Sequence, residues 1–154
     1  MEKSDSPTSI GGFPVEGHLG TGGMGEVYKV RDEAFDRELA LKVIRAIAQG
    51  DEAAAFRFAA EGRLTGQLLH PAVPPVYHLA RDEQENWYYT MLRVRGRSLA
   101  EIIKEHQTDK ESPWTLRRLL GLFVSICNGV SYAHSRGVIH RDLKPQNVIV
   151  GDFG

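Results

Sequence analysis

Residues 140–147 constrain this chain more than any other stretch, because they gather chemically active side chains in one short loop. The eight residues read His-Arg-Asp-Leu-Lys-Pro-Gln-Asn and hold a carboxylate, two cations and two carboxamides. Apolar residues at helical spacing precede them, and the strand-like residues 148–150 follow. A polar loop between two regular elements is typical of a functional site. The alternative is a polar turn whose side chains satisfy one another's hydrogen bonds, and the octet alone leaves it open.

The composition predicts one globular domain and excludes several classes of function. Of the 154 residues, 42% are hydrophobic and 25% are charged, which suits one ordinary core. Because 19 basic residues face 20 acidic ones, the net charge gives no case for binding nucleic acid or an acidic membrane surface. No apolar run reaches the roughly 18 residues of a membrane span. The single cysteine, Cys127, lies in an apolar helical pattern, so we expect a buried thiol, a reducing compartment and a cytoplasmic location.

A glycine-rich segment, residues 20–25, predicts a hairpin that covers phosphate groups. Its glycines fit the pattern G-x-G-x-x-G, which lets backbone N–H groups approach anionic oxygens without a side chain in the way. A dinucleotide-binding turn of this pattern leads into a helix. Here the next residues alternate like a strand, and Val27 lies two residues beyond the last glycine. The other interpretation is that the glycines serve only the geometry of the turn.

A lysine inside an apolar strand predicts an ion pair. Residues 37–44 read as a strand with Lys42 among apolar residues, and a buried ammonium needs an anionic partner. The alternative is a lysine that extends its ammonium into water. The next helix, capped by Asp51, carries Glu61 on or beside its apolar stripe, either as a solvated residue or as the partner of Lys42. We assign that stripe to Phe56, Ala59, Ala60, Leu64 and Leu68.

The remaining pattern alternates short strands and helices with clear ends. Prolines after residue 70 end the first helix, Gly137 ends the last one, and residues 1–12 read as a disordered leader. Residues 92–96 read as an extended connector, and Met91 before it lines a pocket or simply packs in the core. No Cys or His cluster has zinc-type spacing. We expect strands at residues 15–19, 26–30, 37–44, 76–80 and 87–92, and helices at residues 53–69, 98–106 and 115–135.

Taken together, these motifs resemble the N-terminal part of a protein kinase domain of the bacterial serine/threonine type. The loop matches H-R-D-L-x-x-x-N, the hairpin matches G-x-G-x-x-G-x-V, and Ala40-Leu41-Lys42 fits V-A-I-K with leucines as replacements. The resemblance implies an α+β fold in which a five-stranded antiparallel small lobe with one helix is joined to a helical large lobe. It places the small lobe at residues 13–93, the hinge at 94–97 and an incomplete large lobe at 98–154.

The resemblance also implies the roles of the site residues. Asp142 is the expected catalytic base, Lys144 neutralises charge on the transferred phosphoryl group, and Asn147 is a ligand for Mg²⁺. Lys42 with Glu61 is the expected phosphate clamp, and Lys144 followed by proline is typical of kinases that act on serine and threonine hydroxyls of proteins. The expected ATP contacts are Leu19, Gly20, Thr21, Gly22, Gly23, Met24, Gly25, Val27, Ala40, Lys42, Glu61, Met91, Leu92 and Val94.

The last four residues read Gly-Asp-Phe-Gly, but we do not expect Asp152 to be the metal-binding aspartate of a D-F-G motif. In the family a strand hairpin separates that aspartate from the loop asparagine, which needs on the order of ten residues or more. Asp152 lies only five residues after Asn147. We therefore expect these 154 residues to be a catalytically incomplete fragment whose long apolar helix has few partners. The alternative is a non-catalytic module that binds nucleotide or docks a partner.

Overall fold

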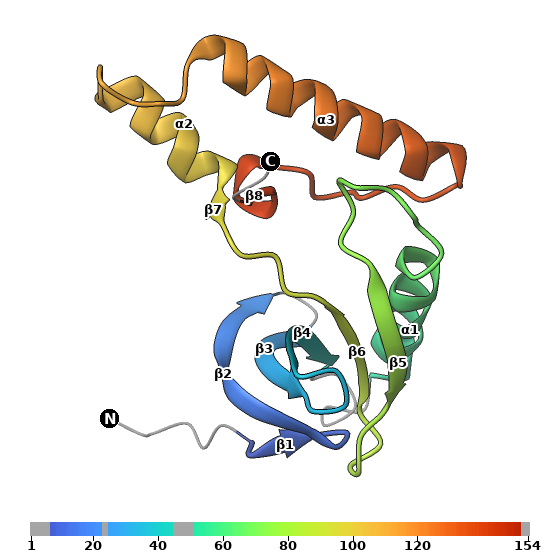
Figure 1. Cartoon of the computed structure of the whole chain (residues 1–154). Helices are drawn as coiled ribbons and strands as arrows, with labels where there is room; N and C mark the ends of the chain where they lie inside the picture. The colour runs from blue at the N-terminus through green and yellow to red at the C-terminus, as the bar shows by residue number, and fades with distance from the viewer. Residues whose placement is uncertain (1–6, 23–24, 45–50, 152–154) are drawn as a thin grey trace. The chain divides into compact units, whose positions relative to one another are not determined.

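The computed structural model describes residues 7–22, 25–44 and 51–151. These residues divide into two compact units, each of which is considered by itself (Figure 1). The first unit comprises Met1–Leu69 and Pro74–Arg93, and the second comprises His70–Val73 and Val94–Gly154.

A curled antiparallel sheet forms the first unit together with helix α1 (Figure 1). The sheet has six strands in the order β1-β2-β3-β4-β6-β5, one more than the sequence predicted. The predicted strands are otherwise confirmed, and the bounds of β4 and β6 agree with the predicted ones. The strands are β1 (Ser9–Ile10), β2 (Phe13–Gly22), β3 (Gly25–Asp32), β4 (Arg37–Ile44), β5 (Val76–Arg81) and β6 (Trp87–Leu92).

The extra strand corrects the prediction of a disordered leader, for which only residues 7–12 are described. Ile10 pairs with Phe13, the first residue of β2, and is buried in the sheet's core. Gly11 and Gly12, which connect them, have positive φ angles of 54° and 81°. Two such residues form the tight hairpin turn that matches the twist of antiparallel strands. The Gly-Gly pair after an isoleucine was the sequence signal for this strand.

The strands also extend further into the glycine-rich segment than predicted. Gly20 pairs with Val27, and Gly22 pairs with Gly25, so most of the expected turn belongs to the hairpin's strands. A register shift follows His18, which marks an irregularity in β2 just before the glycines. Gly23 and Met24 lie outside the described residues.

Two apolar clusters hold the first unit together, one on each face of the sheet. Side chains alternate between faces along each strand, so neighbouring residues of β4 and β6 join different clusters. The first cluster contains Ile10, Tyr28, Val30, Leu39, Leu41 and Tyr88. The second contains Ile44, Ala55, Phe58 and Tyr89, and therefore joins the sheet to α1.

Helix α1 (Glu52–Thr65) begins as predicted, because the Asp51 side chain accepts a hydrogen bond from the Ala54 N–H at 2.8 Å. Its buried face shares Ala59 with the predicted stripe, and Leu68 beyond the helix is also buried as predicted, but the rest differs. Phe56 is exposed, and the face turned to the sheet carries Ala55, Phe58, Ala59 and Gly62. An added Cβ at Gly62 would lie 3.1 Å from a Leu79 methyl group, so close approach of helix and sheet selected small residues over the larger apolar ones.

The second unit contains two helices with well-formed ends. Ser98 caps α2 (Leu99–Thr108) in a reciprocal arrangement with Glu101, which confirms the predicted cap. Helix α3 (Leu116–Ser135) ends at Gly137, as predicted, where φ is 74°. The N–H groups of Gly137 and Val138 donate to the last free carbonyls of the helix at 2.9 Å each, a Schellman arrangement.

The apolar side of α3 is poorly covered. Four of its large apolar side chains are between 55% and 63% exposed: Leu116, Leu120, Phe123 and Val124. This exposure agrees with the expectation that the helix has few packing partners. Cys127 is exposed, so the prediction of a buried thiol is wrong. Its helical pattern was read correctly, but no element packs over that position in the described part of the chain. No helix among the described residues is long and apolar enough to cross a membrane.

We expect Gly25→Ala to destabilise the first unit by about 1–3 kcal/mol. A Cβ at this position would run into the backbone carbonyl of Val43 on the neighbouring strand, and backbone cannot move aside as a side chain does. Urea unfolding followed by circular dichroism measures the change. Gly17→Ala is the matched control, since a Cβ there meets nothing within 4 Å, and equal stability losses in both variants would contradict the steric account.

Candidate active site

An ion pair between β4 and α1 is the centre of the site in the first unit. The Lys42 Nζ lies 2.8 Å from the Glu61 Oε1. The lysine side chain is 19% exposed and the glutamate 38%, so the ammonium is partly withdrawn from water and keeps a carboxylate beside it. The structure therefore favours the paired alternative over a lysine that extends into solvent.

A third residue, which sequence analysis missed, contacts the same carboxylate. The Tyr89 hydroxyl donates to the Glu61 Oε1 at 2.9 Å, and Tyr89 is the cross-strand partner of Lys42. The lysine Nζ also lies 5.6 Å from the ring centroids of Phe58 and Tyr89, within the range of cation–π attraction. The available signal was a tyrosine on the strand's buried face, because a buried hydroxyl needs a partner.

Burial raises the pKa of Tyr89, and the negative charge of Glu61 raises it further. Its hydroxyl therefore stays protonated at every physiological pH and remains a hydrogen-bond donor. The Glu61 carboxylate thus accepts one hydrogen bond from Lys42 on β4 and one from Tyr89 on the adjacent strand β6.

Strand pairing brings several predicted ATP contacts to one face of the sheet. Val27 lies opposite Lys42, and Ala40 lies opposite Met91. Residues directly opposite each other in antiparallel strands share a face, so these four side chains lie on the same side as the ion pair. Met91 also packs against the cluster under α1, so the pocket and core interpretations of this residue are compatible.

The glycine strands leave the bare backbone that a phosphate group requires. An added Cβ at Gly20 meets nothing within 4 Å, and one at Gly22 meets only the Gly25 carbonyl at 4.0 Å. Open space beside unsubstituted backbone fits an anionic ligand held by N–H groups. Thr21 lies between them, paired with Glu26, and Leu19 before them is exposed.

The connector, residues 92–96, offers fewer backbone groups for an adenine ring than predicted. The Leu92 N–H donates to the Pro75 carbonyl at 3.0 Å, so that donor is not available to an adenine ring. Val94, the other expected adenine contact, is exposed and belongs to the second unit.

The loop in the second unit brings its polar side chains together. The Lys144 Nζ lies 2.9 Å from the Asp142 Oδ2. The Asn147 Nδ2 donates to the same oxygen at 3.0 Å and to the Asp142 backbone carbonyl at 2.8 Å. A 3-10 helix, Pro145–Asn147, carries the asparagine, and Arg141 adopts a positive φ of 63°, a strained conformation common at functional sites.

The Asp142 carboxylate is accessible and stays ionised. Its side chain is 65% exposed. Hydrogen bonding to Lys144, followed by that to Asn147, holds the pKa of Asp142 below its ordinary value. A lowered pKa in the folded chain favours folding above the ordinary pKa of a carboxyl, and this contribution is lost as the pH falls through the lowered value.

The loop offers one candidate ligand atom for a metal ion. Because Asn147 donates through its nitrogen, its carboxamide oxygen is the atom left for a hard cation such as Mg²⁺. No group of three or more His, Cys, Asp or Glu side chains suited to a metal occurs among residues 7–22, 25–44 and 51–151. Asp152 lies outside the described residues, so the prediction that it is not a metal ligand stays a prediction.

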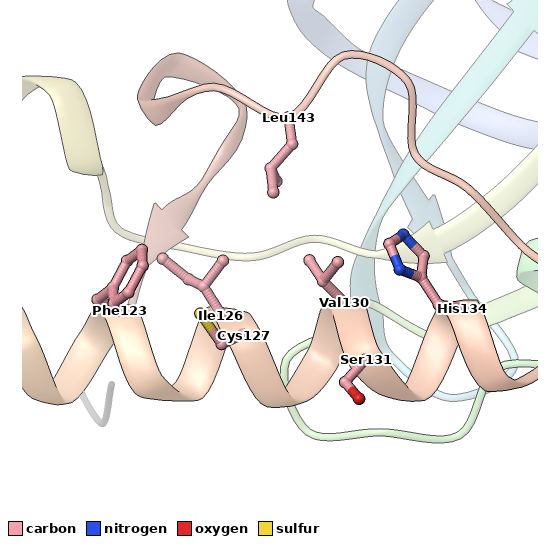
Figure 2. Close-up of a pocket in the computed structure, with 7 residues that line it drawn as sticks. All are labelled: Phe123, Ile126, Cys127, Val130, Ser131, His134 and Leu143. Atoms are coloured by element: carbon pink, nitrogen blue, oxygen red, sulfur yellow. The ribbon is translucent and has the colours of Figure 1, made fainter.

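Beside the loop, α3 carries an apolar hollow of about 310 Å³ (Figure 2). Leu143 points from the loop towards this side of the helix, and Val130 points towards the loop (Figure 2). The hollow has no acidic residue or lysine, so it suits an apolar side chain rather than a nucleotide. Its lining residues are Phe123, Ile126, Cys127, Val130, Ser131, His134 and Leu143.

Comparison with known proteins agrees with this geometry. The family model described as the protein kinase domain matches residues 13–153. The chain belongs to the protein kinase family. The predicted α+β kinase fold is confirmed as well: the crystal structure of the Mycobacterium tuberculosis PknI kinase domain superposes with a TM-score of 0.73 at 26% identity, over 93% of this chain and 55% of that one.

Two relatives in this kinase family come from bacteria. Serine/threonine-protein kinase PknD of Protochlamydia amoebophila is 38% identical over 160 residues, which cover 99% of this chain and 16% of that protein. PknD of Chlamydia trachomatis serovar D is 40% identical over 142 residues, which cover 88% of this chain and 15% of that protein. This kinase chain therefore spans about a sixth of the length of these relatives.

We expect Lys144→Ala to raise the pKa of Asp142, because the lysine is the first cause of its lowered value. Carbon-detected NMR titration of the aspartate carboxyl groups measures the midpoint. Lys110→Ala, at an exposed position in the loop after α2, is the control and should leave the midpoint unchanged. An unchanged midpoint in Lys144→Ala would show that the ion pair does not persist in solution.

Proposed function

We propose that this chain binds ATP with Mg²⁺ and supports transfer of the γ-phosphate to serine or threonine hydroxyls of a protein substrate. The observation that carries the proposal is the Lys42–Glu61 ion pair at 2.8 Å. It lies on the same sheet face as Val27 and Ala40, and the glycine strands beside it have open backbone. Family membership supports the reaction class, since the matched relatives are serine/threonine-protein kinases.

In this proposal the first unit binds the nucleotide. Lys42 holds the phosphates, and Glu61 fixes the position of its ammonium. The backbone of residues 20–25 covers the phosphates. Within this segment, Gly23 and Met24 lie outside the described residues. Leu19, Val27, Ala40 and Met91 surround the adenine ring, whose edge meets the Leu92 carbonyl.

The second unit supplies the groups for chemistry. Asp142, held ionised by Lys144 and Asn147, orients the substrate hydroxyl and accepts its proton. Lys144 breaks its contact with Asp142 and offsets negative charge on the transferred phosphoryl group. Asn147 would hold a metal ion through its carboxamide oxygen. Bound Mg²⁺ neutralises charge on the phosphates.

We further propose that these 154 residues alone bind nucleotide but catalyse phosphate transfer poorly. The chain corresponds to 55–60% of the PknI kinase domains that it matches, and the apolar side of α3 is exposed. An exposed face of this kind also favours the second candidate function, a module that docks a partner protein without catalysis.

We expect Lys42→Met to weaken Mg·ATP binding about tenfold or more, because a charge-assisted contact to the phosphates is lost. Isothermal titration calorimetry on the 154-residue chain measures the affinity. Lys29→Met is the matched control, since this lysine projects from the adjacent strand but pairs with Glu16 and Glu38. Folded wild-type chain that binds no ATP would leave the docking function ahead.

We expect Asp142→Asn to keep Mg·ATP affinity within about twofold while abolishing any phosphate transfer, since the carboxylate acts on the substrate hydroxyl and not on the nucleotide. Transfer from radiolabelled ATP to a mixed protein substrate measures activity, and calorimetry measures binding. Strong transfer by the wild-type chain that disappears in Asp142→Asn would support the assigned base and overturn the proposal that these residues are incomplete.

A further inference from the structure

We propose that Tyr89 is a positioning residue for phosphate binding, acting through Glu61 to fix the ammonium of Lys42. This inference rests on the proposed nucleotide function and adds a residue that the kinase motifs in the sequence do not include. It is carried by one shared atom, the Glu61 Oε1, which receives the Lys42 Nζ at 2.8 Å and the Tyr89 hydroxyl at 2.9 Å.

Tyr89 is the rigid member of this trio. It is only 5% exposed and belongs to the apolar cluster with Ile44, Ala55 and Phe58. Its ring centroid lies 5.1 Å from that of Phe58 on α1. The hydroxyl therefore projects from a packed ring at a fixed place, so a carboxylate bound to it is fixed as well.

Glu61 is the most exposed of the three residues and has most to gain from a second donor. Its side chain is 38% exposed and has several rotatable bonds, so an ion pair alone leaves it many conformations. The hydrogen bond from Tyr89 ties the carboxylate to β6 while Lys42 ties it to β4. Two anchors on adjacent strands restrict both the carboxylate and the helix that carries it.

The arrangement matters most when a phosphate competes with Glu61 for the lysine. As the ammonium turns towards phosphate oxygens, the contact between Lys42 and the Glu61 carboxylate would weaken. The Tyr89 hydroxyl, kept protonated by burial and by the nearby carboxylate, continues to donate to it. Glu61 thus stays beside Lys42 and holds one side of the ammonium while phosphate takes another.

The test compares Mg·ATP with adenosine, which lacks phosphates. We expect Tyr89→Phe to weaken Mg·ATP binding about three- to tenfold and to leave adenosine binding unchanged, because the ring and its packing are kept. Tyr88→Phe is the matched control: that tyrosine is equally buried, but its hydroxyl donates to the Gly11 carbonyl at 3.3 Å on the other face of the sheet. It should change neither affinity.

A double-mutant cycle separates positioning through Glu61 from a general effect on structure. In the Glu61→Ala background, which leaves the Tyr89 hydroxyl no acceptor on this side chain, Tyr89→Phe should cause less than about a twofold further loss of Mg·ATP affinity. Equal loss in both backgrounds, or parallel loss of adenosine binding, overturns the inference while leaving the nucleotide function intact. If instead the folded wild-type chain binds neither ligand, the proposed function itself fails.

A second measurement needs no change at Tyr89. A buried hydroxyl proton donated to a carboxylate exchanges slowly with water and resonates downfield in proton NMR spectra. We expect such a signal from Tyr89 in the wild-type chain and its loss in Glu61→Ala. Rapid exchange of this proton in the wild-type chain would overturn the inference even if Tyr89→Phe proved too unstable to study.

Discussion

A lysine ammonium that is partly withdrawn from water is stabilised by an anion beside it, and much of the first unit is arranged around that contact. The ammonium of Lys42 meets Glu61 from a helix that starts ten residues further along the chain. For this contact, α1 must pack closely on the sheet, which explains the small residues on its buried face. The second apolar cluster, between sheet and helix, supplies the packing that holds the two charges together.

The two units differ in how completely they satisfy their own apolar surface. The first unit has one apolar cluster inside the curl of its sheet and another under α1, so both faces of the sheet are covered by packed side chains. In the second unit, α3 has a well-formed cap at each end but buries little of its apolar side. Local hydrogen bonding stabilises that helix, whereas tertiary packing contributes little to it. The proposed nucleotide site therefore lies in the better-packed unit, and the proposed catalytic loop lies in the less well-packed one.

The polar loop shows that the two interpretations of its sequence are compatible. Its side chains do satisfy one another, since Lys144 and Asn147 both contact Asp142. The same contacts hold an accessible carboxylate ionised and leave an amide oxygen for a metal. A set of internal hydrogen bonds is therefore what prepares the proposed site, and the inert turn and the functional loop are one structure.

Local sequence predicted much of the fold because its signals act over a few residues. The caps at Asp51 and Ser98 follow from side chains that bond their own neighbouring backbone. The end of α3 follows from a glycine that adopts a positive φ, and the bounds of β4 follow from its run of apolar residues. The family resemblance, carried by short motifs in order, identified the kinase fold. The apolar stripe of α1 was misassigned because Phe56 and Phe58 are equally apolar, and only the sheet's position decides which one is buried.

The sequence by itself thus determined the elements, their order and the chemical groups available to the site. Tertiary structure decided which of those groups meet. Tyr89 contacts a glutamate 28 residues away, Ile10 folds back onto the sheet, and Cys127 stays exposed because no described element covers it. Each of these outcomes depends on contacts between segments distant in the chain, and periodicity along one segment carries no information about its distant neighbours.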